Sequence, residues 1–265
     1  AGTRWAVQDH CRWELDAERL VAITIQDDVN DVLVEEGRQF WPSGQLEDLG
    51  LPATYKVERA GARRQVLTDI VIGDPARPDL TIERAEVDIV PTFGLPTVGK
   101  VRLVRPRLYG TYKQAKASFG VLDKLLFAES GRAPGLPDLD LELIDGRARL
   151  DSDFGPIGVK AEGAGNLKSG FSGVLAAVAP KLGGSGCKGE GVTLFGKLAV
   201  ADAQPHFTGP LRAVSLSCAG QGLSLARAGV ELDLTAGAQF ESLSGKLGLS
   251  SGALGWQGNR ARGMA

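Results

Sequence analysis

The chain has 265 residues and a formal net charge of −2, with 36 glycines and only 6% aromatic residues. This charge balance excludes the strongly basic surface that nucleic-acid-binding proteins present, and the sequence contains no apolar run long enough for a membrane-spanning helix. So many glycines and so few large side chains argue against a thick packed core, and they favour a long, bent sheet.

Residues 1–45 differ from the rest of the chain. Val21, Ile25, Val29 and Val32 follow a helical spacing, although the β-branched residues among them weaken that pattern. We expect an N-terminal segment over 1–45 whose pattern fits a helix, followed by one β-rich region over 46–265.

The alternation of apolar and charged residues is clearest near the middle of the chain. Leu139, Leu141 and Leu143 alternate with acidic residues, and Asp145-Gly146 follows them. A period of two gives a strand one apolar and one charged face. Asp-Gly is typical of a tight hairpin turn, so the pattern predicts strands at 139–144 and 147–153 joined by that turn.

Two other places depart from simple alternation. The apolar residues of 80–89 change phase near Glu83-Arg84, which predicts a β-bulge there. Ser118 can cap a helix over 118–127 whose apolar face carries Val121, Leu122, Leu125 and Leu126.

After Gly135 one expected strand follows another. The expected ranges after the two above are 157–167, 171–179, 192–201, 211–218, 223–226, 229–236 and 240–249. Such a series of strands and turns is typical of a meander, a sandwich or an elongated solenoid. We predict a mainly β fold built as an elongated, twisted antiparallel sheet with a groove-like face.

Motifs for catalysis, metals and cofactors are weak. Residues 184–189 spell G-x-G-x-x-G, but the residues that follow alternate as a strand, whereas a dinucleotide site needs a helix there. His10 and His206 have no nearby nucleophile, and the cysteines lack the spacing of a zinc site. We therefore expect no catalytic residues, no metal and no cofactor.

What remains is one aliphatic face along the sheet, and the pattern leaves two interpretations. The face is either the core of an ordinary β-sandwich or the lining of a groove that binds acyl chains. In the second case, the expected lining consists of Leu139, Leu141, Leu143, Leu194, Leu198, Leu232 and Leu234.

The cysteines also leave two interpretations. The strands expected around Val192–Ala201 and Leu211–Ser217 would be antiparallel neighbours, which places Cys187 beside Cys218. The two residues either form a disulfide, which would indicate an oxidising compartment, or remain buried thiols. We predict the disulfide between Cys187 and Cys218, which would leave Cys11 as a free thiol.

Several stretches beyond residue 50 resemble a known family. They include Leu67–Pro75, Leu80–Glu83, Pro106–Gly110, Ser118–Leu126 and Gly209–Ala213. These stretches resemble the N-terminal periplasmic portion of YdbH/TamB-like members of the AsmA-like superfamily, as found in alphaproteobacteria. The resemblance covers about four-fifths of the chain and implies a piece of a longer protein.

The resemblance implies a non-catalytic lipid-binding module in the periplasm. Its groove would shield phospholipid acyl chains between the inner and outer membranes, and a segment absent from this chain would anchor it in the inner membrane. TamB-like members also suggest an alternative, the assembly of outer-membrane or secreted β-proteins, in which an exposed strand edge pairs with a client strand. A β-solenoid enzyme acting on polysaccharide is a further alternative, and it would need a cluster of carboxylates on one face.

Overall fold

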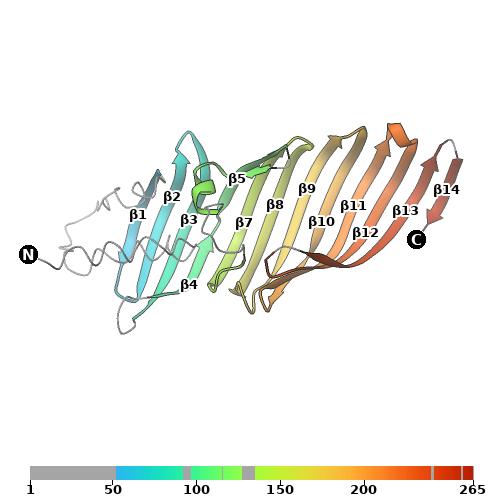
Figure 1. The fold of residues 1–265 in the computed structure, drawn as a ribbon. Coiled ribbons are helices and arrows are strands. Elements are labelled where there is room, and N and C mark those ends of the chain that lie inside the picture. The colour runs from blue at the N-terminus through green and yellow to red at the C-terminus, as the bar shows by residue number, and fades with distance from the viewer. Residues whose placement is uncertain are drawn as a thin grey trace, which may run out of the picture.

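The computed structural model describes residues 52–91, 97–114, 116–126, 135–239, 242–257 and 259–264. The expected N-terminal segment over 1–45, its helix and Cys11 lie outside these residues. The described residues form one long, twisted sheet of 14 strands that runs from the N-terminal to the C-terminal side of the molecule (Figure 1). The predicted mainly β fold is confirmed.

Most strands pair with their neighbours in the chain, and these pairs are antiparallel. The exception is β7, which pairs in parallel with β4 and with β5. The strands are β1 (Ala53–Ala60), β2 (Arg64–Asp74), β3 (Arg77–Val90), β4 (Thr97–Val104), β5 (Arg107–Lys113), β6 (Lys116–Ser118), β7 (Asp140–Ser152), β8 (Gly155–Asn166), β9 (Ser172–Gly184), β10 (Cys187–Ala201), β11 (Gln204–Cys218), β12 (Leu223–Ala236), β13 (Leu243–Trp256) and β14 (Asn259–Met264). A short 3₁₀ helix, η2 (Ala219–Gln221), joins β11 to β12.

The helix predicted over 118–127 is present in a shorter form. It consists of a 3₁₀ turn, η1 (Gly120–Leu122), and one α-helical turn, α3 (Asp123–Leu126). Ser118 is not its N-cap, because it is the last residue of β6. Instead, the Val121 N–H donates to the carboxylate of Asp79 on β3 at 2.9 Å, so a distant strand supplies the cap.

The buried apolar residues gather in the N-terminal half of the sheet. One cluster contains Ile70, Ile72, Ile82, Ala85 and Leu122, and a second contains Val87, Val101 and Leu139. Among the described residues of β8 to β14, only Ala179, Val200 and Cys218 are buried apolar side chains within strands. Among the described residues, the buried clusters therefore lie at the N-terminal end of the sheet.

The hairpin predicted at Asp145-Gly146 is wrong. The chain does not reverse there, and β7 is a single strand from Asp140 to Ser152. Asp145 has a positive φ of 47°, and the ladder to β8 shifts register between Leu143 and Gly146. The dipeptide supplies the left-handed backbone that a turn also requires, but here it makes a bulge that moves the apolar residues from odd to even positions.

The bulge predicted near Glu83-Arg84 is also wrong, although the change of phase is real. The pairs Thr68–Arg84 and Ile70–Ile82 keep one register, so no residue is inserted there between β2 and β3. The opposite residue, Asp69, has a φ of 52°, and this left-handed residue turns the side chains that follow it to the other face.

These changes of phase form lines across the sheet. The first line joins Asp69 of β2, Glu83 of β3, Arg105 just after the end of β4, and Asp145 of β7, which the flanking pairs place opposite one another. The second line joins Pro180, Gly191, Val214, Arg227 and Gly252 from β9 to β13. We call each line a crease, because every strand that crosses it changes its apolar side at the same level.

Candidate functional site

One face of the strands β8 to β13 is almost entirely apolar, and we call it the apolar face. Residues that pair across an antiparallel ladder point to the same side of the sheet. Leu194, Leu211, Val230 and Leu249 form one such row, and Leu198, Phe207 and Leu234 form another.

No charged residue occupies the apolar face among the described residues of β8 to β13, and Ser251 is its one polar member. The opposite side, which we call the charged face, carries Lys160, Lys197, Arg212 and Asp233. Along one strand the two kinds of residue alternate, so the separation of the faces follows directly from the period of two.

The structure places the predicted lining residues on one side of the sheet but in two environments. Leu194, Leu198, Leu232 and Leu234 lie on the apolar face and are partly exposed. Leu141 and Leu143 lie on β7, next to the buried clusters, and are also partly exposed. By contrast, Leu139 is only 8% exposed, because it packs against Val87 and Val101.

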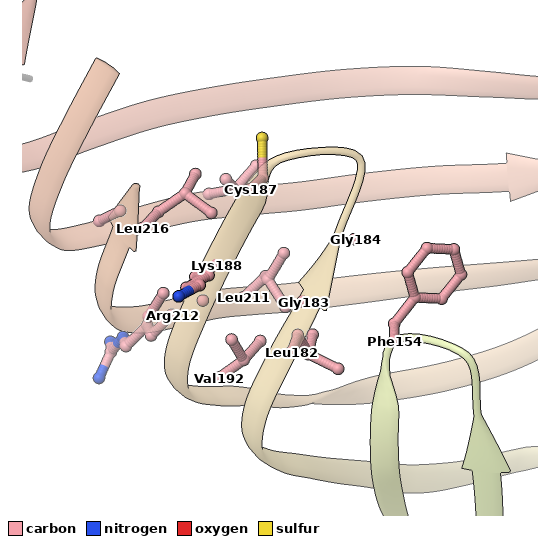
Figure 2. Close-up of a pocket in the computed structure, with 14 residues that line it drawn as sticks. Phe154, Leu182, Gly183, Gly184, Cys187, Lys188, Val192, Leu211, Arg212 and Leu216 are labelled. Atoms are coloured by element: carbon pink, nitrogen blue, oxygen red, sulfur yellow. The ribbon is translucent and has the colours of Figure 1, made fainter. Parts of the chain in front are cut away.

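A hollow of about 340 Å³ lies on the apolar face (Figure 2). Leu182 and Leu216 line it on one side of the second crease, and Val192 and Leu211 line it on the other side. The lining of the hollow therefore spans the second crease. The volume of the hollow lies within the range of small-molecule sites. Its lining is apolar apart from Lys188 and Arg212, which belong to the charged face by their place in the ladder.

Phe154, in the turn between β7 and β8, closes one side of this hollow (Figure 2). A Cβ atom on Gly184 would lie 2.6 Å from its ring, so the ring occupies the space that a side chain would fill. Phe171 lies in the same way against Gly163, and Phe207 against Gly196. Sequence periodicity did not identify these aromatic–glycine pairs, because they depend on the cross-strand register.

Cys187 and Cys218 face each other at the ends of β10 and β11, at the rim of the hollow. Their sulfur atoms are joined in a disulfide, and they are directly paired in the ladder between the two strands. The disulfide therefore links β10 and β11, the strands that also carry Leu194 and Leu211 of the apolar face.

The charged face has its own hollow, of about 470 Å³, beside Arg107, Arg147 and Lys160. These three cations are in register on β5, β7 and β8, and all lie near the carboxylate of Asp145, at 3.0, 3.3 and 3.6 Å. The hydrogen bond from Arg107 and the nearby Arg147 hold the pKa of Asp145 below its usual value. A hydrogen bond to Glu162 raises the pKa of Lys160. Because one carboxylate lies close to all three cations, it offsets the repulsion between them and stabilises the pairing of β5, β7 and β8.

Other chemistry has little support in the described part of the chain. No group of three or more His, Cys, Asp or Glu side chains there could hold a metal ion. His206 lies on the charged face and contacts Asp233 at 2.8 Å, whereas His10 lies outside the described residues. No described helix is long and apolar enough to cross a membrane.

One comparison with known proteins gives a match. The family model described as "YdbH-like: Intermembrane phospholipid transport protein YdbH" matches residues 41–263. This range includes β1 to β13 and all of β14 except its last residue. No curated protein matches the chain, and neither does any solved structure.

Proposed function

Because this chain belongs to the YdbH-like family of intermembrane phospholipid transport proteins, we propose that its apolar face binds phospholipid acyl chains. The observation that carries the proposal is the lack of charge on this face from β8 to β13, together with its incomplete burial. If this face were the core of the protein, a second layer would cover it. A surface that binds acyl chains must instead stay accessible.

The energetics favour this ligand class. Each methylene group removed from water contributes about 0.8 kcal/mol, so a long chain gains affinity without any specific polar contact. The lipid headgroup would stay in water at the rim of the sheet, since an unpaired charge on the apolar face would be costly. Binding of this kind requires no catalytic residue, and we propose a transport role without catalysis.

The envelope location follows from the family, and we propose the periplasm as the compartment. The Cys187–Cys218 disulfide supports this proposal, because disulfides persist in oxidising compartments such as the periplasm. Anchoring to the inner membrane would depend on a segment outside this chain. Contacts with outer-membrane proteins would contribute less to the function than lipid binding does.

The test is one substitution on each face of the sheet. Leu211→Asp places a carboxylate in the hollow of the apolar face, whereas Thr193→Asp places one at an exposed position of the charged face. We expect delipidated wild-type protein and Thr193→Asp to bind fluorescent phosphatidylethanolamine. We expect Leu211→Asp to bind at least about a hundredfold more weakly, because the carboxylate must be desolvated under the chain.

Circular dichroism of each variant would check that the sheet is intact. Equal binding by the two variants would contradict the proposal. A second contradictory result would be absence of lipid binding combined with protection of edge-strand amides by a β-strand peptide, which would favour a role in protein assembly.

A further inference from the structure

We infer that the acyl path is closed at its N-terminal end, so that chains occupy β8 to β13 and cannot continue along the sheet to β1. This inference rests on the proposed function. The closed end consists of a cover, η1 with α3, that packs on β2 and β3, and of a buried cluster within the sheet around Leu139.

The cover over β2 and β3 is centred on Leu122 of η1. Its side chain is only 6% exposed and packs in one cluster with Ile70, Ile72 and Ile82 of β2 and β3. These isoleucines are 3–8% exposed, so water-accessible apolar surface is nearly absent there. An acyl chain could reach them only by displacing Leu122.

Three separate contacts hold this cover in place. The Val121 N–H donates to Asp79 of β3, and the Phe119 N–H donates to Asp123 at 2.5 Å. The ring of Phe119 fills the space above Gly110 of β5, where a Cβ atom would lie 2.7 Å from the ring. The cover is therefore bound to two strands of the sheet and to itself.

In the second part of the closed end, the sheet itself supplies Leu139, which continues β7 in register with β4 and β8. It packs against Val87 of β3 and Val101 of β4, which are 7% and 5% exposed. The carbonyl of Leu139 accepts a hydrogen bond from the Leu167 N–H at 2.9 Å, just beyond the end of β8. This hydrogen bond continues the ladder between β7 and β8, so Leu139 is part of the sheet and is buried within it.

Further along the sheet, on β9 to β12, the same side is open. The hollow beside Phe154 begins there, and Leu194, Leu211 and Val230 are only partly buried. If the cover and the buried cluster close one end, phospholipid must enter along the rims of the sheet or from the C-terminal side. A lipid could not enter past β1.

The experiment maps where a bound chain lies. The probe is phosphatidylethanolamine with a diazirine at the end of one acyl chain, delivered to the full chain from vesicles of phosphatidylethanolamine and phosphatidylglycerol. After illumination, mass spectrometry identifies the labelled peptides. We expect label in β10, β11 and β12, and at least about tenfold less in β2 and β3, because each methylene excluded from burial costs about fourfold in affinity.

Leu122→Ala should then open the closed end. The cavity has room for roughly two methylene groups, so label on Ile72 and Ile82 should rise on the order of tenfold. Lys116→Ala, at an exposed position of β6, is the control and should leave the label pattern unchanged.

Equal label on both halves of the wild-type sheet would overturn this inference and leave the proposed function standing. Absence of label throughout would overturn both. The wild-type map decides the question even if Leu122→Ala fails to fold.

Discussion

The two halves of this sheet share one sequence pattern and differ in what covers it. In β2 to β4, the apolar side contains the two buried clusters, and Leu122 of η1 covers part of it. In β8 to β13, the corresponding side is partly exposed. Alternation therefore predicts which residues share a face, whereas a second layer decides whether that face is a core or an accessible surface.

The residue types differ in the same direction. The buried side of β2 to β4 is rich in β-branched residues such as Ile70, Ile72, Val87 and Val101. The apolar face of β8 to β13 uses mainly leucine, alanine and glycine. Stiff β-branched side chains fit a fixed core, whereas leucine and alanine around glycine leave shallow space.

The largest expected contrast is between Ile72→Asp and Leu211→Asp. Ile72 is 3% exposed in the closed core, so its replacement should cost about 5 kcal/mol and abolish folding. The same change at partly exposed Leu211 should leave a folded protein. Urea unfolding followed by circular dichroism measures both, and similar losses of stability would show that the two halves are equally closed.

The next effect concerns the disulfide of the open half. Cys187 and Cys218 are 31 positions apart, so replacing both with alanine should cost about 3–4 kcal/mol through the freedom gained by the unfolded chain. Hydrogen exchange should become faster in β10 and β11 and change little in β2 and β3, because the closed core does not depend on this link.

Thiol counting provides the control for this variant. Denatured wild-type protein should show one reactive thiol, Cys11, without reductant and three with it. A count of three without reductant would contradict the disulfide, and uniform acceleration of exchange would contradict the independence of the two halves.

The smallest effect lies at the boundary between the halves, where Asp145 binds three cations. Its pKa is lowered in the folded state, so its contribution is present above the usual aspartate pKa of about 3.9 and is lost as the pH falls through the lower folded value. Asp145→Asn should therefore lower the Tm at pH 7 and flatten its decline below about pH 4.

Asp151→Asn is the matched control for Asp145→Asn. Asp151 lies on the same strand and pairs with Arg149 at 3.2 Å, but both side chains are more than half exposed. An exposed pair of this kind contributes little, so the Tm should change less at pH 7. If the two variants behave alike, the shared carboxylate has no special role at this boundary.

The sequence predicted the class of the fold and the common side of most lining residues, because both follow from a period of two. It did not predict that Leu139 belongs to a core, since burial there depends on contacts with β3 and β4. The predicted hairpin at Asp145-Gly146 is wrong because a turn and a crease can use the same left-handed backbone. Local preference alone does not determine whether the chain then reverses or continues.

The cap of η1 illustrates the same limit. Ser118 fits the local rule for a cap, but the carboxylate that binds the Val121 N–H comes from Asp79, 42 positions away. Similarly, the pairs of phenylalanine and glycine across strands depend on register, which the sequence pattern does not specify.

The creases also have a mechanical consequence. Twelve strands lie side by side along the main path of the sheet, which at about 4.8 Å per strand gives a length of roughly 50 Å. A flat sheet of that length bends easily, whereas a sheet that is creased along its long axis resists bending. The two creases run along this axis and contain Asp69, Arg105, Gly191 and Arg227. We therefore expect these residues to stiffen the sheet along its length.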